Sequence, residues 1–202
     1  MSYNLSVVLI SPSPTSDVAD LLLELNLGKY QKGHDIPLSE VEGWRVRDDI
    51  YAGVHNGVLL LMNEVLVDRL LSVATTSIEA DFVRVFPEAD IVVLSYGSTS
   101  TSYNYLIIKK GEKIRFKQGS QGGTVIDHGM LLDMEKELNE EDVITVGDKE
   151  DLFADNSKED AEAIVEGLKG ASIFRQLFEH YLGVSDSSLE NENIKLSVYR
   201  KS

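Results

Sequence analysis

Cysteine is absent from this chain of 202 residues. Its absence excludes disulfide bonds, thiolate catalysis, iron–sulfur clusters and zinc sites built on thiolates. Long apolar runs are missing too. The stretch Val7-Val8-Leu9-Ile10 is too short for a signal peptide or a membrane-spanning helix, and it follows no basic segment. These absences suit a reducing compartment, and we predict a cytoplasmic protein.

Positive charge is scarce in the chain. It has 19 Lys and Arg residues against 34 Asp and Glu, a formal net charge of −15, and residues 130–202 alone carry 18 acidic against 8 basic side chains. A surface of this sign repels a phosphate backbone and anionic lipid. The composition therefore predicts no nucleic-acid partner and no membrane partner, and it leaves a protein partner open.

Sequence motifs of high catalytic specificity are also lacking. The glycine-rich segment at residues 119–123 has neither the spacing of a dinucleotide-binding loop nor that of a P-loop. Ser120 lacks the flanking glycines of a nucleophile elbow. We predict no cofactor.

Hydrophobic patterning is the most informative feature that remains. Residues 91–94 and 105–108 are unbroken apolar runs, typical of strands covered on both faces, and Asn56-Gly57 separates two short apolar segments as in a β-hairpin. Apolar residues at helical spacing follow Ser157 and continue to Gly183. The mixed order of strands and helices predicts an α+β fold, with a mixed, largely antiparallel sheet, hairpins and packed amphipathic helices. We expect one domain over residues 1–202, either a single unit or two lobes that meet near residue 87.

Local signals place the individual elements. We predict strands at 5–10, 51–55, 58–62, 91–94, 105–108, 114–117, 125–126, 143–146 and 194–199. Helices are predicted at 17–27 after the N-cap Ser16, 64–71 after Asn63, 76–86 with Thr76 in a capping box, 131–138 and 157–182. An extended conformation is the alternative for residues 82–86, and residues 29–49 are expected to be irregular.

A concentrated row of basic residues follows the second apolar run. Lys109 and Lys110 lead into a turn at Gly111, and simple alternation then places Lys113, Arg115 and Lys117 on one exposed face, with Ile114 and Phe116 on the core face. Such a row suits a phosphate or an acidic partner. The alternative is that these residues keep an exposed hairpin soluble.

The pair Asp127-His128 comes directly after the glycine-rich loop. A carboxylate beside an imidazole can serve general acid–base chemistry. Adjacent strand residues, however, point to opposite faces, and we predict that His128 forms no nucleophile–base pair with Ser120. The four histidines, at 34, 55, 128 and 180, show no metal-ligand spacing. We predict no metal site, and an exposed His180.

Trp44, Arg45, Arg47 and Tyr51 form a further cluster of aromatic and guanidinium groups. Such residues are typical of interface anchors, so Trp44 and Arg47 are candidate binding residues. Core packing of Trp44 is the alternative.

Several short segments, in this order, resemble a bacterial protein family of unknown function. They are Ile50-Tyr51-Ala52-Gly53, Phe86-Pro87, Gly111, Lys113-x-Arg115, the glycine-rich loop and Tyr181-Leu182-Gly183, and the resemblance covers roughly residues 5–183. It implies a cytoplasmic bacterial protein with an α+β fold and no particular activity. In that family the position of His128 is more often acidic.

Two functional hypotheses follow from the sequence. The first is a non-catalytic binding or protein-interaction module that uses the basic hairpin or the acidic C-terminal third. The second is a small hydrolytic enzyme that uses Asp127 and His128. The first is preferred because an enzyme usually displays a sharper constellation of residues.

Overall fold

A single nine-stranded antiparallel sheet organises the protein. The structure, a computed structural model, describes residues 4–41, 48–97, 102–120, 123–138, 143–144, 152–154, 156–184 and 194–202. The strand order is β2-β9-β3-β4-β1-β5-β6-β7-β8, and every pair of neighbours is antiparallel. The strands are β1 (Asn4–Ser11), β2 (Tyr30–Pro37), β3 (Ile50–His55), β4 (Val58–Met62), β5 (Asp90–Gly97), β6 (Ser102–Lys109), β7 (Glu112–Ser120), β8 (Gly123–Gly129) and β9 (Lys195–Lys201). The predicted α+β class is confirmed.

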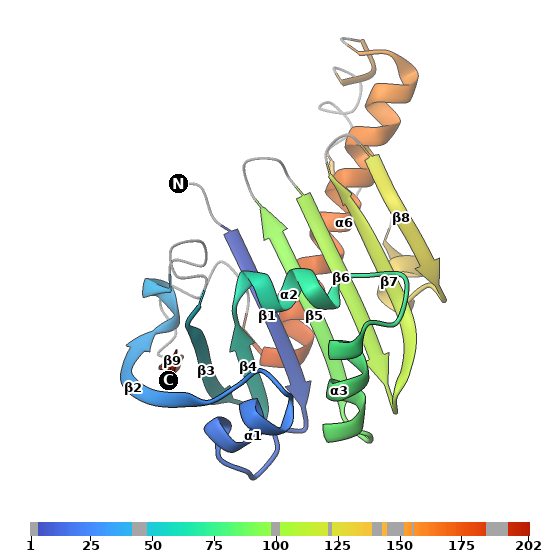
Figure 1. Cartoon of the computed structure of the whole chain (residues 1–202). Helices are drawn as coiled ribbons and strands as arrows, with labels where there is room; N and C mark the ends of the chain where they lie inside the picture. Colours follow the sequence, from blue (N-terminus) through green and yellow to red (C-terminus); the bar gives the residue numbers. More distant parts are fainter. Residues whose placement is uncertain are drawn as a thin grey trace.

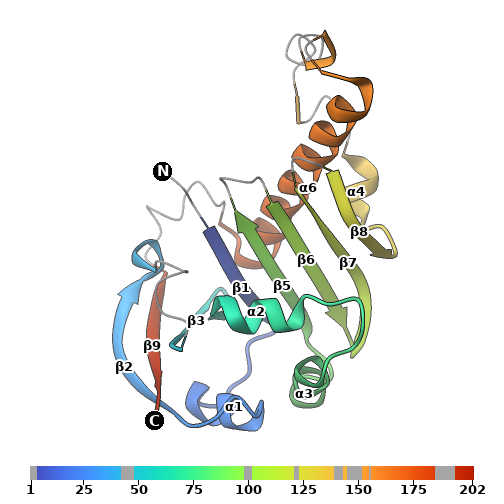
Figure 2. The same cartoon turned by 45° about the horizontal axis from the view of Figure 1, so that its top comes forward.

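Helices cover both faces of this sheet. In Figures 1 and 2, α1 (Val18–Glu24), α2 (Glu64–Leu70) and α3 (Ser77–Val85) lie on one side, and the long α6 (Lys158–Leu182) runs along the other. We call these sides the α2 face and the α6 face. Each face has its own apolar core, and consecutive residues of the central strands alternate between the two cores. This explains why residues 91–94 are apolar without interruption.

Side-chain caps fix where the helices begin. Asn63 accepts a hydrogen bond from the Leu66 amide at 2.7 Å and starts α2, and Thr76 starts α3 in the same way, both as predicted. The N-cap of α1 is Asp17 and not Ser16, because the Asp17 carboxylate accepts from the Ala19 amide at 2.8 Å. Each cap satisfies an amide that the helix itself leaves unpaired.

The helix α6 is continuous over 25 residues. The Ser157 hydroxyl accepts from the Asp160 amide at 3.2 Å, and Gly183 ends the helix with φ 72°. Phe174 and Phe178 are buried in the core of the α6 face, with Tyr181 packed against it. The apolar pattern that follows Ser157 in the sequence therefore corresponds to one continuous helix.

Two predicted hairpins form as expected. Asn56 and Gly57 have φ of 49° and 76°, and Lys110 and Gly111 have φ of 49° and 75°. Two consecutive residues with positive φ suit the right-handed twist of the flanking strands.

The structure also corrects the sequence interpretation. Residues 30–37, expected to be irregular, form edge strand β2, which pairs with β9 from the other end of the chain, and residues 38–40 form a short 3-10 helix. Of the strand predicted at 143–146, residues 143 and 144 lie in a turn and a bend, and the rest lies outside the described residues. The suggested boundary near residue 87 falls between α3 and β5, while β1 pairs with strands from both sides of it.

Candidate functional site

A β-bulge in β7 splits the predicted basic row between the two faces of the sheet. Arg115 lies opposite Ile107 and Lys113 lies opposite Ile108, so Ile114 is an extra residue on β7. Ile114 packs against the α6-face core. The bulge therefore places Lys113 on the α2 face, whereas Arg115 and Lys117 face α6. The prediction that all three share one face is wrong.

Lys113 binds the elements that cover the α2 face. Its ammonium lies 2.7 Å from the Glu79 carboxylate of α3 and donates to the carbonyls of Ser72 and Val73 at 2.8 and 3.2 Å. Both side chains are largely buried, at 11% and 4% exposed. Lys113 thus fastens α3 and the segment before it to the sheet.

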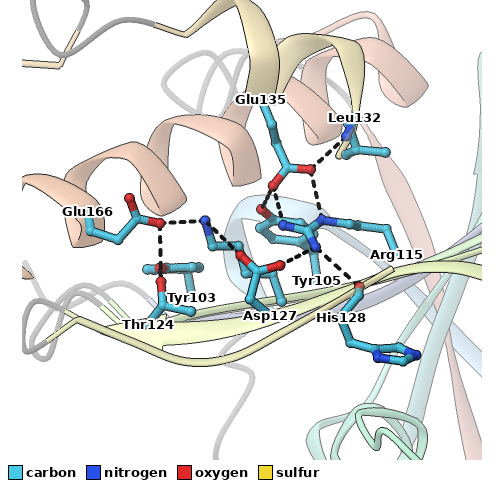
Figure 3. A network of polar contacts seen from close by, with 10 residues as sticks. Tyr103, Tyr105, Arg115, Thr124, Asp127, His128, Leu132, Glu135 and Glu166 are labelled. Carbon is cyan, nitrogen blue, oxygen red and sulfur yellow. Dashed lines mark hydrogen bonds and ion pairs between the residues drawn. The ribbon is translucent and has the colours of Figure 1, made fainter. Parts of the chain in front are cut away.

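Arg115 is fully buried, which corrects the prediction that it is exposed. Its guanidinium forms a two-pronged pair with Glu135, with Nε donating to Oε2 at 2.8 Å and Nη2 to Oε1 at 2.6 Å. Nη1 donates to the Asp127 carboxylate and, at 3.2 Å, to the His128 carbonyl (Figure 3). Such planar pairing is among the strongest hydrogen bonding available to a carboxylate. Phe116 is buried on the opposite face, as expected.

Glu135 is the second anchor of this network. It belongs to the short helix α4 (Asp133–Glu137) and is held by the Tyr105 hydroxyl and the Leu132 amide, which both donate to it at 2.8 Å. The carboxylate is 5% exposed. One buried carboxylate therefore joins α4 to strands β6 and β7.

Lys117 extends the network to α6. Its ammonium lies 2.5 Å from Glu166 and 3.8 Å from Asp127. Thr124 of β8 donates to the same Glu166 oxygen at 3.2 Å, and the hydroxyls of Tyr103 and Thr124 are 3.0 Å apart. We call the set Tyr103, Tyr105, Arg115, Lys117, Thr124, Asp127, Glu135 and Glu166 the α6-face network.

The electrostatics of the network favour its charged form. Hydrogen bonding to Arg115 lowers the pKa of Asp127. Burial alone would lower the pKa of Lys117, but hydrogen bonding and attraction to Glu166 outweigh it and raise that pKa. Desolvation and the Glu135 carboxylate raise the pKa of Tyr105, so its hydroxyl stays a donor. Near neutral pH, Asp127 and Lys117 are therefore ionised, whereas Tyr105 is neutral.

Asp127 and His128 do not converge on one reacting atom. The Asp127 carboxylate points into the network, whereas the His128 ring lies on the other side of the sheet (Figure 3). The lowered pKa of Asp127 makes it a poor proton acceptor near neutrality. The opposite orientation follows from the strand period of two. This geometry gives no support to general acid–base chemistry by the pair.

The remaining candidates are Trp44, Arg47 and the histidines. Trp44 and Arg47 lie outside the described residues. His180 is exposed on α6, as predicted, and contacts the ring of Tyr181 at a centroid distance of 5.0 Å. Within the part of the chain that the structure describes, no group of three His, Asp or Glu side chains is arranged to hold a metal ion.

Sequence reasoning missed Glu135 and Glu166, which neutralise the two buried cations. Both lie far along the chain from β7, and no local spacing connects them to it. One signal for such partners was present in the sequence, because two basic residues lie in a strand that follows fully apolar strands. Buried cations require carboxylate partners.

The pH dependence of unfolding should report on Asp127. Because its pKa is lowered in the folded state, its ionised form stabilises the fold above the ordinary carboxyl pKa of about 3.9, and this contribution is lost as pH falls through the lowered value. We expect Asp127→Asn to lower the urea midpoint at pH 7, with a gap to wild type that narrows below about pH 4.

Asp68→Asn is the matched control, and its expected effect on stability at pH 7 has the opposite sign. Burial raises the pKa of Asp68, so its charge opposes folding at pH 7 and the asparagine variant should be the more stable protein there. The difference in stability between Asp68→Asn and wild type should also decrease as the pH falls. A gap between Asp127→Asn and wild type that stays constant with pH would contradict the assignment.

Comparison of the chain with protein-family models, with curated proteins and with solved structures finds no match. The resemblance to a bacterial family therefore stays a prediction. Among the described helices, none is both long and apolar enough to cross a membrane.

Proposed function

We propose that this protein is a cytoplasmic bacterial protein-interaction module without catalytic activity, and that the outer edge of β8 binds an extended segment of a partner protein. The observation that carries the proposal is the apolar surface at this edge. Val125, Met130 and Leu131 are 74%, 73% and 50% exposed, within seven consecutive residues. Exposed apolar residues gathered in this way are typical of interaction sites.

The backbone of β8 supports the same interpretation. It is the last strand on its side of the described sheet, and Figures 1 and 2 show it at the outer margin. An edge strand presents unpaired amides and carbonyls to which an extended segment can add as a further strand.

The neighbouring charges define the partner's chemistry. The α6-face network holds three carboxylates against two cations, and Asp127 and Glu166 are 46% and 36% exposed beside β8. On the α2 face, Ile126 lies at the margin of the apolar core. A strand alternates its side chains between faces. The edge therefore suits a segment that alternates basic and apolar residues, with its basic side chains toward Asp127 and Glu166.

A direct test uses a fluorescein-labelled nine-residue peptide that alternates Val and Lys, compared by fluorescence anisotropy with one that alternates Val and Glu. We expect the Lys peptide to bind and the Glu peptide to bind at least tenfold more weakly. Val125→Lys/Met130→Lys should weaken Lys-peptide binding at least tenfold, because it removes apolar surface and adds like charge.

The control places the same substitutions at other exposed apolar residues. Leu23 on α1 and Val54 on β3 are 50% and 56% exposed, so Leu23→Lys/Val54→Lys makes the same charge change away from β8. If both peptides bind equally well, the β8 edge does not select basic residues. If Leu23→Lys/Val54→Lys weakens Lys-peptide binding as much as Val125→Lys/Met130→Lys does, the peptide does not bind at the β8 edge. If the wild-type protein hydrolyses a substrate in a hydrolase panel and His128→Ala abolishes that hydrolysis, the hydrolytic function is established instead.

A further inference from the structure

The tip of the β3–β4 hairpin is the Asn-Gly dipeptide at residues 56 and 57, which occurs once in the chain. Sheet pairing ends with His55 opposite Val58, so Asn56 and Gly57 form a two-residue loop. Both are exposed, and both have positive φ. Asn-Gly suits such a loop because both residues tolerate positive φ. In the same dipeptide the asparagine amide is easily lost, because glycine has no side chain to shield its backbone nitrogen.

The Asn56 side chain fastens this hairpin to the end of α6. Its Nδ2 donates to the Leu182 carbonyl at 2.7 Å. The last carbonyls of a helix have no partner within the helix, so this hydrogen bond satisfies one of them. The contact is close, since a methyl group at Gly183 would lie 3.1 Å from the same Nδ2. The junction therefore requires a hydrogen-bond donor at Asn56.

Gly57 is open to the reaction that removes this donor. No described atom lies within 4 Å of the position that a Cβ of Gly57 would take. Its carbonyl accepts from the Ser13 amide at 2.6 Å, which leaves its nitrogen on the other side of the residue. The Asn56 side chain must leave Leu182 before it can turn towards that nitrogen. The hydrogen bond to α6 therefore controls how often the reaction can begin.

We propose that Asn56 is a site of spontaneous covalent modification, and that its deamidation releases the end of α6 from the β3–β4 hairpin. The Gly57 nitrogen loses its proton and attacks Cγ of Asn56. The new Cγ–N bond closes a succinimide ring, the Cγ–Nδ2 bond breaks, and Nδ2 leaves as ammonia with that proton. One water molecule then opens the ring at either carbonyl, which yields aspartate or isoaspartate. Water is the only co-reactant, and no group is oxidised or reduced.

Both products disrupt the junction with α6. An ionised carboxylate accepts hydrogen bonds but cannot donate one to the Leu182 carbonyl. It also places negative charge at the C-terminal end of a helix, where the helix dipole is negative. Isoaspartate adds a carbon atom to the backbone of a two-residue turn as well. The strands β1, β5, β6 and β7 separate this hairpin from β8, so the inference goes beyond the proposed interaction function.

The first test follows the Asn56 amide in the folded protein. Native protein is incubated at pH 8, digested, and its peptides are separated and weighed by mass spectrometry. Asn26 is the internal control, because it is exposed, has φ 56° and donates to Asp81 at 2.8 Å, but precedes Leu27. We expect Asn56 to lose its amide at least tenfold faster than Asn26, and to give two product peptides of equal mass.

Two results of this test would overturn the proposal. One is that Asn56 keeps its amide as long as Asn26 does. The other is that Asn56 loses its amide in urea above the unfolding midpoint but not in the native protein, which would show that the folded hairpin prevents the reaction.

The second test measures the effect of the product on the junction. Asn56→Asp should lower the urea midpoint at pH 7, and the difference from wild type should narrow below about pH 4 as the carboxylate is protonated. Asn156→Asp is the matched control. Asn156 also donates to a carbonyl, that of Leu152 at 2.9 Å, but it lies beside the N-cap of α6, where negative charge is favourable. Its urea midpoint should not fall.

An unchanged midpoint in Asn56→Asp, or an equal fall in Asn156→Asp, would show that the carboxylate does not release α6. If Asn56→Asp does not fold, wild-type protein is compared before and after incubation at pH 8, and a midpoint that stays the same after deamidation would contradict the release of α6.

Discussion

Arg115→Met should lower the free energy of unfolding by about 3–5 kcal/mol, because it leaves a buried carboxylate without its counter-ion. Glu135 is 5% exposed and would keep only the Tyr105 hydroxyl and the Leu132 amide as donors. Asp127 would lose a partner as well. Urea denaturation of the variant at pH 7 measures the effect.

A double variant separates the cost of a stranded charge from the value of the ion pair itself. Replacing a whole buried pair with apolar residues of similar size is often close to neutral. We therefore expect Arg115→Met/Glu135→Leu to recover at least half of the loss seen in Arg115→Met.

Lys136→Met on α4 is the exposed control. Its ion pair with Asp133 joins side chains that are 56% and 89% exposed, and its removal should change the free energy of unfolding by less than about 0.5 kcal/mol. A similar small effect in Arg115→Met would show that the α6-face network contributes little to stability.

The burial of Arg115 illustrates what the sequence can predict and what it cannot. The hairpin turn and strand β7 follow from local signals, since Gly111 permits a positive φ and the next residues alternate. The bulge at Ile114 is not encoded by that alternation. It shifts the register by one residue, and such a shift moves side chains to the other face.

The sequence also does not show which faces of the sheet are covered by helices. An alternating strand is usually solvated on its polar face, and that assumption led to an exposed basic row. The helix α6 covers this face, and it comes from residues far along the chain. The amphipathic pattern predicted the helix itself, but nothing local specified which strands it packs on. The sequence did not indicate Glu135 and Glu166 as partners either, because both lie far along the chain from β7.

Gly170→Ala should destabilise the protein by about 1–3 kcal/mol, although the same change inside a helix usually favours the helical state by nearly 1 kcal/mol. A methyl group at Gly170 would fall within the ring of Tyr103. That ring is fully buried, and on the β7 side a methyl group at Gly119 would also overlap its hydroxyl end. The ring therefore has no free direction in which to move, and α6 would have to shift away from β6.

The expected stability change of Gly170→Ala is opposite in sign to that of an ordinary Gly→Ala change in a helix, so this variant tests how α6 packs on the sheet. Removing the obstacle should rescue the variant, so Gly170→Ala should cost less in a Tyr103→Leu background than in wild type, as measured by a double-mutant cycle of urea denaturation. Glu162→Ala, at an exposed position of the same helix, should change stability by no more than about 0.5 kcal/mol. If Gly170→Ala instead stabilises the protein, then α6 does not contact Tyr103 through this glycine. The ion pair between Lys117 of β7 and Glu166 of α6 would then need a different geometry.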